Sequence, residues 1–486
     1  MTRSRTKTGT RAGMGDSATR ARSLVNRLSS EVLRRIHEGA LPVGTRLPSV
    51  RGYAKECGVS NETVLRVYDN LVALGYLEAR RGAGFFVVRN RIESDTPRAA
   101  WSGNLRPDEA WLRVLFESGA DSTGLGSGLL PADWLDQPAI GKALQTLSAG
   151  PAQFLSGYAD PGGYWPLREQ LRLKLHEQGI PAKSSQIITT AGATDALHLT
   201  IWANFFPRNY VLAEDPGPFL QIQRILAGGM EVMRVPRLED GPDLEALQAA
   251  CEKHKPRAFF CSSVMQNPTS TSLTPYKAHQ VLKIAEAHDL LIIDDDTYGD
   301  LLPPAAAGSV GRLAALDQLD RVIHIGSFSK TVAPGLRSGF LAASPRQIER
   351  ILLYRTVGAI HGTPLTDLLM HHLLASGRYR SHCEAVRTRL DAARGPVQDA
   401  LAALGCRIAP MASGMYLWAS LGPGVDALAV SRKLAPLGIQ TAPGPVFSRA
   451  PEHTSHMRFN VAFAETSTDW AKPLAEAIEA SRMPSP

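Results

Sequence analysis

Cysteine is scarce in this sequence, and its spacing excludes common cysteine-based scaffolds. The five cysteines Cys57, Cys251, Cys261, Cys383 and Cys406 are odd in number, scattered, and form no Cys-x-x-Cys pair. A disulfide framework needs paired cysteines in an oxidising compartment, and a cysteine-based zinc site needs closely spaced ones. The pattern argues against both and is typical of a protein from a reducing cytoplasm.

Long apolar segments and common nucleotide-binding motifs are also missing. No run of about eighteen apolar residues occurs, and no apolar signal core follows the N-terminus. Membrane spanning and secretion are therefore disfavoured, and we expect a soluble cytoplasmic protein. Neither G-x-G-x-x-G nor G-x-x-x-x-G-K-[ST] is present, so dinucleotide-binding and P-loop folds lack support.

Positive charge is concentrated at one end of the chain. The 486 residues exceed what one hydrophobic core usually holds, so two or more domains are expected. Residues 1–90 contain 16 Lys and Arg against 7 Asp and Glu, whereas the rest of the chain contains 37 against 39. This distribution predicts a polyanionic partner for the N-terminal part alone.

The first 23 residues are rich in Arg, Thr, Ser and Gly and nearly lack apolar side chains. Such a segment cannot bury a core, so we interpret residues 1–23 as a disordered basic arm. Its Arg-rich, acid-poor composition also resembles an organellar transit peptide. The DNA-binding pattern that follows it favours the arm.

Residues 24–90 have the pattern of a small domain that begins with a helix. Apolar residues recur at helical spacing at Leu28, Val32 and Ile36, and Gly39 ends this helix. The domain is therefore expected to pack this helix against the elements that follow.

Two shorter helices separated by a tight turn are predicted next. Ser49 can cap a helix that runs to about Glu56, and Gly58 provides the turn. Ser60, with Thr63, opens the second helix. A helix, a tight turn and a helix is the arrangement that places the second helix in a DNA major groove.

The second helix has one apolar side and one polar side. The residues predicted to be buried are Val64, Val67, Tyr68, Leu71 and Leu74, and those predicted to face outward are Asn61, Glu62, Leu65 and Arg66. Tyr76 to Ala79 and Gly84 to Val88 then predict a hairpin whose turn, residues 80–83, carries two arginines. Cations and glycine amides at such a turn suit contacts with DNA phosphates.

This segment resembles the winged helix-turn-helix of the GntR family of bacterial regulators, with G-x-x-L-P-S-x-R, G-V-S-x-x-T-V and G-x-G-x-F-V all present. The resemblance implies a DNA-binding set of Arg46, Ser49, Arg51, Ser60, Asn61, Thr63, Arg66, Arg80, Arg81 and Gly84. Arg46 and Arg51 would contact the DNA backbone or bases, the helix from Asn61 would enter the groove, and Arg80, Arg81 and Gly84 would form the wing. The family usually has arginine where this chain has Asn61, which can instead read adenine with two hydrogen bonds.

The rest of the chain divides into a linker and a large α/β domain. Residues 91–125 lack sustained periodicity and predict a linker that gains some structure near Glu109 to Phe116. From residue 126 to 486, apolar runs typical of buried parallel strands occur at Gln186–Thr190, Tyr210–Glu214, Ala258–Val264, Leu290–Asp294, Val322–Ile325 and Gly339–Ala343. Most are separated by helical stretches, such as Ala193–Phe206, Pro275–His288 and Arg346–Thr356.

The sequence Ser327-Phe328-Ser329-Lys330 follows one of these predicted strands directly. The strand would deliver Lys330 to the edge of the sheet where ligands bind in open α/β folds. A desolvated amine there is less basic and can form a Schiff base. Arg337, seven residues later, suits an anionic ligand. The alternative is a solvated surface lysine in a polar loop.

Two further polar groups follow other predicted strands. Asp294, Asp295 and Asp296 end an apolar run, and Tyr298 follows them. Three buried carboxylates need a cationic partner, and a magnesium or calcium ion is the alternative to a positively charged group. The segment Ala191 to Thr194 joins a strand to a helix, so its amides can hold a phosphate or form an ordinary turn.

Together these motifs resemble the fold-type I enzymes of the aspartate aminotransferase superfamily, which bind pyridoxal 5′-phosphate (PLP). The resemblance covers about Gly126 to Ala477 and implies a mainly parallel central sheet with a smaller C-terminal α+β subdomain. It implies that Lys330 is the Schiff-base lysine, that Asp295 keeps the pyridine nitrogen protonated, and that Tyr298 and Asn267 hold the ring oxygen O3′. Phosphate would be bound by Ala193, Thr194, Ser327, Ser329 and Arg337, and a substrate carboxylate by Arg458.

One matching residue and one departure complete this resemblance. Tyr158 in Tyr-Ala-Asp-Pro-Gly-Gly matches a tyrosine that reaches the phosphate of the other subunit, which would make the protein a homodimer. The alternative is a core tyrosine. Relatives place an aromatic ring over the cofactor where this chain has Pro218, and Phe219 is the candidate substitute.

A GntR-type head fused to an aminotransferase-like body resembles the MocR subfamily of bacterial regulators. The resemblance implies a PLP-dependent transcriptional regulator whose body senses PLP or an amino compound through the Lys330 aldimine and whose heads bind a double-stranded operator. The alternative is a working aminotransferase that carries an accessory DNA-binding domain. Either would begin with an amine displacing Lys330.

Overall fold

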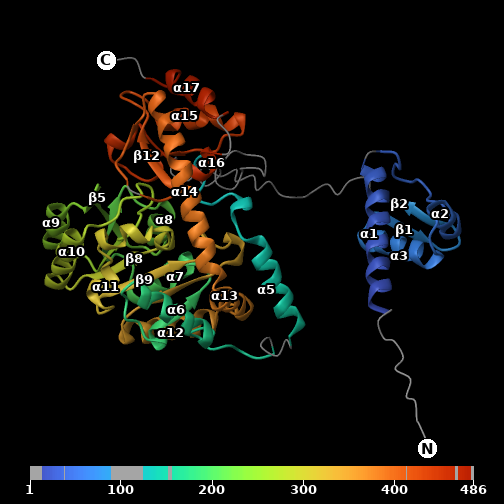
Figure 1. Ribbon diagram of the computed structural model, residues 1–486, viewed down its shortest axis with the longest axis horizontal. Helices are drawn as coiled ribbons and strands as arrows, with labels where there is room; N and C mark the ends of the chain where they lie inside the picture. The colour runs from blue at the N-terminus through green and yellow to red at the C-terminus, as the bar shows by residue number, and fades with distance from the viewer. Residues whose placement is uncertain are drawn as a thin grey trace, which may run out of the picture. The chain divides into compact units, whose positions relative to one another are not determined.

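The computed structural model describes residues 14–37, 39–88, 124–150, 156–411, 413–465 and 469–482. The chain forms two compact units, Met1–Leu105 and Arg106–Pro486, drawn in Figure 1. The linker predicted for residues 91–125, and the structure expected near Glu109 to Phe116, fall almost entirely outside the described residues. Among those that are described, no helix is both long and apolar enough to cross a membrane.

The N-terminal unit is a helix-turn-helix followed by a hairpin, as the sequence predicts. Its elements are α1 (Met14–His37), α2 (Val50–Cys57), α3 (Asn61–Ala73), β1 (Leu77–Arg80) and β2 (Gly84–Val87). The two strands pair antiparallel. Val32 and Ile36 of α1 pack with Val64 and Tyr68 of α3 in one buried cluster. Burial of this shared apolar face holds the three helices together.

Two expectations for this unit were wrong. The helix α1 begins at Met14, so residues 14–23 are helical and not part of a disordered arm. Once the buried turns of α1 have formed, adding further residues to the helix is favourable, and Ala and Arg are good helix formers. Leu74 is 49% exposed, because it is the C-cap of α3 and lies beyond its buried stripe.

The C-terminal unit is built on an eight-stranded sheet with strand order β3-β10-β9-β8-β7-β4-β5-β6. The strands are β3 (Ile187–Thr190), β4 (Tyr210–Asp215), β5 (Glu231–Leu238), β6 (Gly241–Pro242), β7 (Ala258–Cys261), β8 (Leu291–Asp295), β9 (Val322–Ser327) and β10 (Gly339–Ala342). The five consecutive strands β5, β4, β7, β8 and β9 run parallel to one another. The carboxyl ends of β4, β7, β8 and β9 therefore meet at one edge of the sheet.

Helices cover both faces of this sheet (Figure 1). One buried cluster joins strand residues with α7 (Ala193–Asn204), α8 (Phe219–Ala227) and α12 (Pro345–Ala359). A second cluster lies on the other face, with α6 (Trp165–Glu177), α9 (Leu244–His254), α10 (Pro275–Ala287), α11 (Leu313–Asp317) and α13 (Pro364–Ala375). The α5 helix (Gln137–Ala149) also contributes Ala139 and Ala143 to this second cluster. The fold is thus the expected α/β layer arrangement.

The last predicted strand of the sheet does not run parallel. The strand β10 is antiparallel to both β3 and β9, so the expectation of a parallel strand at Gly339–Ala343 was wrong. The segment 328–338 between β9 and β10 contains a 3-10 turn, Pro334–Leu336, and no α-helix. A parallel neighbour requires a longer crossover connection, usually with a helix.

A smaller subdomain follows the sheet along the chain. Its antiparallel sheet has the order β11-β12-β14-β13, with β11 (Arg407–Ile408), β12 (Tyr416–Ser420), β13 (Ala442–Pro443) and β14 (His456–Asn460). Its helices are α15 (Ala427–Leu434), α16 (Val461–Ala464) and α17 (Ala471–Glu479). This is the predicted C-terminal α+β subdomain.

The long helix α14 (Arg378–Ala403) connects the large sheet domain to this subdomain (Figure 1). Tyr379 and Cys383 in its first turns belong to the core of the sheet domain. Val386 and Leu390, further along, belong to the core of the C-terminal subdomain. Burial at both ends of one helix therefore ties the two parts together.

Candidate functional site

Lys330 lies in the loop that follows β9, at the edge where several strands end. The lysine is half-buried. Burial, and then the nearby charge of Arg458, lower the pKa of the Lys330 amine to about 8, although the Asp295 carboxylate acts in the opposite direction. Lys330 is therefore not a fully solvated surface lysine. An amine with a pKa near 8 is partly neutral at physiological pH, as a nucleophilic amine must be.

Gly128 marks the point where three separate segments meet beside Lys330. A Cβ placed on Gly128 would lie 3.7 Å from Lys330 Nζ, 3.6 Å from the Tyr416 hydroxyl and 3.9 Å from Arg458 Nη2. These groups come from the loop after β9, from β12 and from β14. The absence of a side chain at Gly128 keeps the space between them open.

The three consecutive carboxylates at the end of β8 each have a different partner. Asp294 accepts hydrogen bonds from the backbone amide and hydroxyl of Ser263, at 2.8 and 2.7 Å. Asp296 forms an ion pair with Arg312. Asp295 accepts from the Thr297 amide at 3.1 Å and acts electrostatically on Lys330. Of the three carboxylates, only Asp295 has an electrostatic interaction with Lys330 among the causes of its pKa shift.

Burial affects the ionisation of this run. Burial and then the neighbouring charge of Asp296 raise the pKa of Asp294 to about 7, although the hydrogen bonds from Ser263 oppose the change. Burial also raises the pKa of Asp295, against the opposing hydrogen bonds from Thr297 and the charge of Lys330. Within the described residues, no group of three or more His, Cys, Asp or Glu side chains is arranged to hold a metal ion.

Arg458 is held rigidly next to the lysine. Its Nη1 donates to Asn267 Oδ1 and its Nη2 to the Gly126 carbonyl, both at 2.6 Å. Its guanidinium lies 4.2 Å from the Tyr416 ring centre and 4.9 Å from that of Phe447. The residue is only 5% exposed, and its buried Nε has no hydrogen-bond partner among the described residues. A planar cation with donor capacity to spare suits a carboxylate.

The approach of Gly126 to β13 explains how this arginine finds its carbonyl partner. A Cβ on Gly126 would lie 2.3 Å from the backbone of Thr441 and Ala442, so only glycine fits there. The Gly126 amide donates to the Gln440 carbonyl at 2.7 Å. Asn460 of β14 donates to the carbonyls of Ser127 and Leu129. The segment around Gly126 is thus fastened to the C-terminal subdomain.

The residues predicted to bind phosphate lie at the start of α7, at the end of β9 and in the loop between β9 and β10. The α7 helix begins at Ala193 after Gly192, which has φ 87° and provides no side-chain cap for Ala193 and Thr194. Arg337 Nη2 donates to the Ala191 carbonyl at 2.9 Å. The Ser327 hydroxyl accepts from the Ser329 amide at 3.2 Å. The Arg337 guanidinium therefore lies beside the uncapped start of α7.

The sequence left open the roles of two aromatic residues, Tyr158 and Phe219. Tyr158 is 82% exposed and its ring lies 5.9 Å from that of His361, so the alternative of a core tyrosine was wrong. Pro218 is the N-cap of α8, and Phe219, its first residue, is buried. The proposed substitution of Phe219 for the missing stacking ring stays a prediction.

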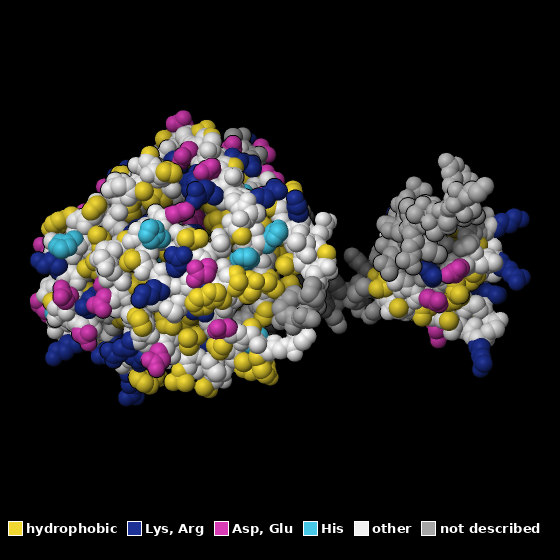
Figure 2. Space-filling view, turned by 60° about the horizontal axis from the view of Figure 1, so that its bottom comes forward, with side chains coloured by type: hydrophobic (Ala, Val, Ile, Leu, Met, Phe, Trp, Pro, Cys, Tyr) yellow, Lys and Arg dark blue, Asp and Glu magenta, His cyan; other side chains and the backbone are white. Residues whose placement is uncertain are grey.

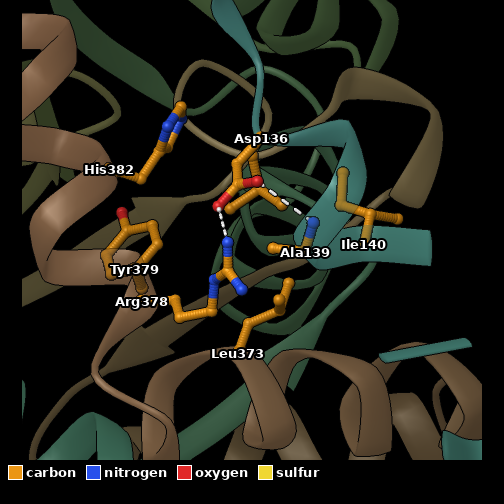
Figure 3. A pocket seen from close by; sticks show the side chains of 8 residues that line it. Asp136, Ala139, Ile140, Leu373, Arg378, Tyr379 and His382 are labelled. Atoms are coloured by element: carbon orange, nitrogen blue, oxygen red, sulfur yellow. Dashed lines mark hydrogen bonds and ion pairs between the residues drawn. The ribbon is translucent and has the colours of Figure 1, made fainter. Parts of the chain in front are cut away.

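A small pocket lies against the lysine loop, between that loop and α14 (Figure 3). It is lined by Asp136, Ala139, Ile140, Val332, Leu373, Arg378, Tyr379 and His382. Thr331, next to Lys330, shares a hydrogen bond of 3.0 Å with the Tyr379 hydroxyl, and its carbonyl lies 2.6 Å from His382 Nε2. The α14 helix therefore fixes the backbone beside the lysine.

The residues predicted to bind DNA lie on the surface of the N-terminal unit. Nine of the ten are exposed, and Thr63 is half-buried. Figure 2 shows Lys and Arg side chains projecting from this unit. Arg66 pairs with Glu62 at 2.7 Å and Arg80 with Glu78 at 3.0 Å. Arg81, at the hairpin turn, forms no ion pair within the part of the chain that the structure describes.

The predicted hydroxyls of this unit form helix caps. Ser49 Oγ accepts from the Gly52 amide, and Ser60 Oγ accepts from the Thr63 amide at 3.2 Å. Both helices of the motif thus begin as the sequence predicts. A Cβ on Gly84 would lie 3.4 Å from Arg46 Nε, so Arg46 lies beside the hairpin. The exposed residues of the motif and hairpin form the candidate DNA-binding surface.

Sequence reasoning missed Tyr416, Gly128, Gly126 and Phe447. No local motif contains them, and each reaches the site through pairing or loop packing over long sequence distances. The Gly126-Ser127-Gly128 run, at the start of the α/β region, was the one available signal. Glycines so spaced indicate close backbone approach, but not to what.

Comparisons with known proteins agree with both units. Residues 24–87 match the gntR family of bacterial regulatory proteins, and residues 120–478 match the aminotransferase class I and II family. The chain is 27% identical to an uncharacterized HTH-type transcriptional regulator, YjiR, of Escherichia coli, over 93% of this chain and 98% of that one. It is also 27% identical to a probable rhizopine catabolism regulatory protein, MocR, of Rhizobium meliloti, over 78% and 76%.

A solved structure extends the comparison to the fold. Kynurenine aminotransferase of Pyrococcus horikoshii matches with a TM-score of 0.71 at 22% identity, covering 78% of this chain and 96% of that one. The likeness confirms the fold-type I architecture. The chain belongs to the aminotransferase class I and II family and carries an N-terminal GntR-type helix-turn-helix, the combination of the MocR-type transcriptional regulators.

Proposed function

We propose that this protein is a DNA-binding transcriptional regulator whose body binds PLP at Lys330 and senses an amino compound that reacts there. The observation that carries the proposal is the convergence of Lys330 Nζ and Arg458 Nη2 on the space beside Gly128. The Lys330 amine, with its pKa lowered to about 8, suits an aldehyde. The buried guanidinium next to it suits an anionic group. Such a regulator would act in the cytoplasm.

The side chains at the site fit the proposed cofactor. Asp295 is buried and interacts electrostatically with Lys330, and a buried carboxylate can hold the proton of a pyridine nitrogen. Asn267 uses its Oδ1 for Arg458, which leaves its amide nitrogen to donate to the ring oxygen O3′. Tyr298 would donate to the same oxygen. PLP, when bound, supplies an aldehyde that condenses with amines and a ring that takes up electrons.

The phosphate of the cofactor would lie at the start of α7. The amides of Ala193 and Thr194, the hydroxyls of Ser327 and Ser329, and Arg337 supply the donors. Two observations support this placement. The α7 helix has no side-chain cap at its start, and Arg337 Nη2 lies 3.1 Å from a Cβ placed on Gly192. A phosphate would thus complete the helix start.

The effector class follows from Arg458. Its ring contacts with Tyr416 and Phe447 and its bonds to Asn267 and Gly126 fix the guanidinium plane. A fixed, buried guanidinium favours a carboxylate over other groups. We therefore propose an amino acid, whose amine would react at Lys330 and whose carboxylate would bind Arg458.

We further propose that the protein is a homodimer in which Tyr158 reaches the partner's phosphate site. The support is its 82% exposure, together with an apolar surface on α7 and α12 where Trp202, Leu353 and Val357 are 50%, 70% and 83% exposed. Apolar side chains gathered on one surface are typical of an interface. Light scattering should give the mass of two chains, and a single-chain mass would contradict the dimer.

The cofactor proposal is tested by absorbance after PLP is added to the purified full chain. We expect the wild type to show the visible absorbance band of lysine-bound PLP. Lys330→Ala should lose it entirely, because the groups found beside Lys330 among the described residues include no second amine. The matched control is Lys283→Ala, which removes an exposed lysine of α10 and should keep the band. A wild type without the band would contradict the proposal.

A working aminotransferase is the second candidate. The observation that favours it is the full set of Lys330, Asp295, Tyr298, Asn267 and Arg458 at one site, which can hold both cofactor and substrate. Sustained formation of oxo acid from a panel of amino acids would support it. Amino acid-dependent DNA binding without turnover would support the regulator.

A further inference from the structure

Two tyrosine hydroxyls from different parts of the body are bonded to each other beside Lys330. Tyr298 follows β8 in the large domain, and Tyr416 opens β12 of the C-terminal subdomain. Their hydroxyl oxygens are 2.9 Å apart, and their rings meet edge to face with centres 5.4 Å apart. Both side chains are buried, with Tyr416 only 1% exposed. The proposed cofactor role of Tyr298 leaves Tyr416 without one.

The Tyr416 hydroxyl borders the reacting region itself. It lies 3.6 Å from the same Gly128 point that lies 3.7 Å from Lys330 Nζ. The Tyr416 ring packs against Arg458, whose guanidinium is 4.2 Å from the ring centre. The ring therefore has one task, packing against Arg458, and the hydroxyl can have another. Replacing the tyrosine by phenylalanine would separate the two.

The bond between the hydroxyls must have a direction. Each hydroxyl carries one proton, so only one of them donates in the shared bond. Burial raises the pKa of Tyr298 well above its usual value, and the neighbouring Tyr416 raises it further, so Tyr298 keeps its proton at neutral pH. When Tyr416 donates, the Tyr298 proton is available to an acceptor in the site. A donor that itself accepts a hydrogen bond is strengthened by it.

We propose that Tyr416 is a positioning residue that donates to the Tyr298 hydroxyl and so directs the Tyr298 proton to the ring oxygen of the cofactor. The inference rests on the proposed function, because that oxygen belongs to PLP. Directed in this way, Tyr298 stabilises negative charge on the ring oxygen. The Lys330 nitrogen, once bonded to the cofactor, would then lose its proton at a lower pH.

Other charged groups face Lys330 and must be kept constant in any test. They are Asp295 at the end of β8, Arg458 on β14 and Arg337 before β10. Tyr416→Phe leaves all three in place and keeps the ring beneath Arg458. A change in the titration of the lysine-bound cofactor in this variant therefore reports the hydroxyl.

The experiment is a pH titration of the absorbance of the PLP-loaded full chain. Tyr416→Phe should raise the midpoint by about 0.3 to 0.6 pH unit, the effect of losing cooperative strengthening of one hydrogen bond. Tyr298→Phe should raise it more, because the donor itself is lost. The double variant should match Tyr298→Phe alone, because Tyr416 acts only through Tyr298. A midpoint unchanged in Tyr416→Phe, or shifts that add in the double variant, would overturn the inference.

Two controls separate this inference from folding defects and from the cofactor proposal. Placing 3-fluorotyrosine at position 416 keeps the ring and makes its hydroxyl a stronger donor, so the midpoint should fall; a rise would overturn the inference. Tyr68→Phe, which removes a buried tyrosine hydroxyl of the N-terminal unit, should leave the midpoint unchanged. A wild type without the absorbance band would overturn the proposed function, and the inference with it.

Discussion

The two units of this protein present their functional side chains in opposite ways. In the N-terminal unit the predicted DNA-binding residues lie within residues 46–84, and nearly all are exposed. In the C-terminal unit Arg458 bonds to the Gly126 carbonyl across 332 positions of sequence and is 5% exposed. The first surface is local and solvated, whereas the second site is assembled from distant segments and shielded from water.

This difference sets how strongly charges act in each unit. Exposed cations attract a polyanion over a distance and are screened by salt. Buried charges interact more strongly, but each needs a partner to offset its desolvation. Ion pairs of the two units make the contrast measurable: Arg237 and Glu214 are 0% and 1% exposed, and Arg66 and Glu62 are 62% and 73% exposed.

The largest effect is expected from breaking the buried pair. Arg237 donates to Glu214, to the Ser262 carbonyl at 2.9 Å and to Thr271 Oγ1 at 3.1 Å. Arg237→Leu leaves Glu214 buried without its cation and should lower the free energy of unfolding by about 3 to 5 kcal/mol. Urea unfolding followed by tryptophan fluorescence measures it, because residues 1–100 contain no tryptophan.

The matched control is the exposed pair on α3. Arg66→Leu should change the stability of the N-terminal unit by about 0.5 kcal/mol or less, because exposed pairs contribute little and leucine is also a good helix former. Far-UV circular dichroism follows both units, so the transition that the tryptophan fluorescence does not show reports this unit. Equal losses from Arg237→Leu and Arg66→Leu would break the comparison.

The two units also show which structural features the sequence can and cannot predict. The elements of both units were predictable, because caps such as Ser49 and Ser60 and apolar strands such as Val322–Ile325 are local signals. The predicted direction of β10 was wrong because the length of the connection, and not the apolar run, decides whether two strands pair parallel or antiparallel. The predicted start of α1 was wrong because a helix, once formed, can extend beyond the residues that show the apolar pattern.

A smaller effect is expected from a cation at the hairpin of the N-terminal unit. Arg81→Ala should weaken binding to DNA by about tenfold, and should lower the slope of log K against log salt concentration by about 1, because one phosphate contact is lost. Fluorescence anisotropy at several salt concentrations measures both. The loss should be similar for every DNA sequence.

The control for this prediction is an exposed arginine of the other unit. Arg346→Ala on α12 should leave DNA affinity and its salt dependence unchanged. If Arg81→Ala has no effect on the salt slope, the hairpin does not contact phosphate, and the candidate DNA-binding surface is wrong there.

The candidate site in the body was predictable only in part. Lys330, Asp295 and Arg458 follow strand ends or lie in recognisable motifs, so sequence indicated them. Tyr416 and Gly128 carry no such signal, because each enters the site through packing between segments that are far apart in sequence. Likewise, the run of three carboxylates suggested one cation, but Asp294 and Asp296 have partners of their own in Ser263 and Arg312.

The central claim is that chemistry at Lys330 changes DNA binding by the other unit. The direct measurement is the affinity of the PLP-loaded chain for a DNA fragment that the protein itself selects from a random library, with and without a panel of amino acids. At least one amino acid should change the wild-type affinity several-fold, on the order of the 1 to 3 kcal/mol typical of coupled sites. Lys330→Ala should bind the fragment without responding to any of them. An equal response in Lys330→Ala would contradict the account.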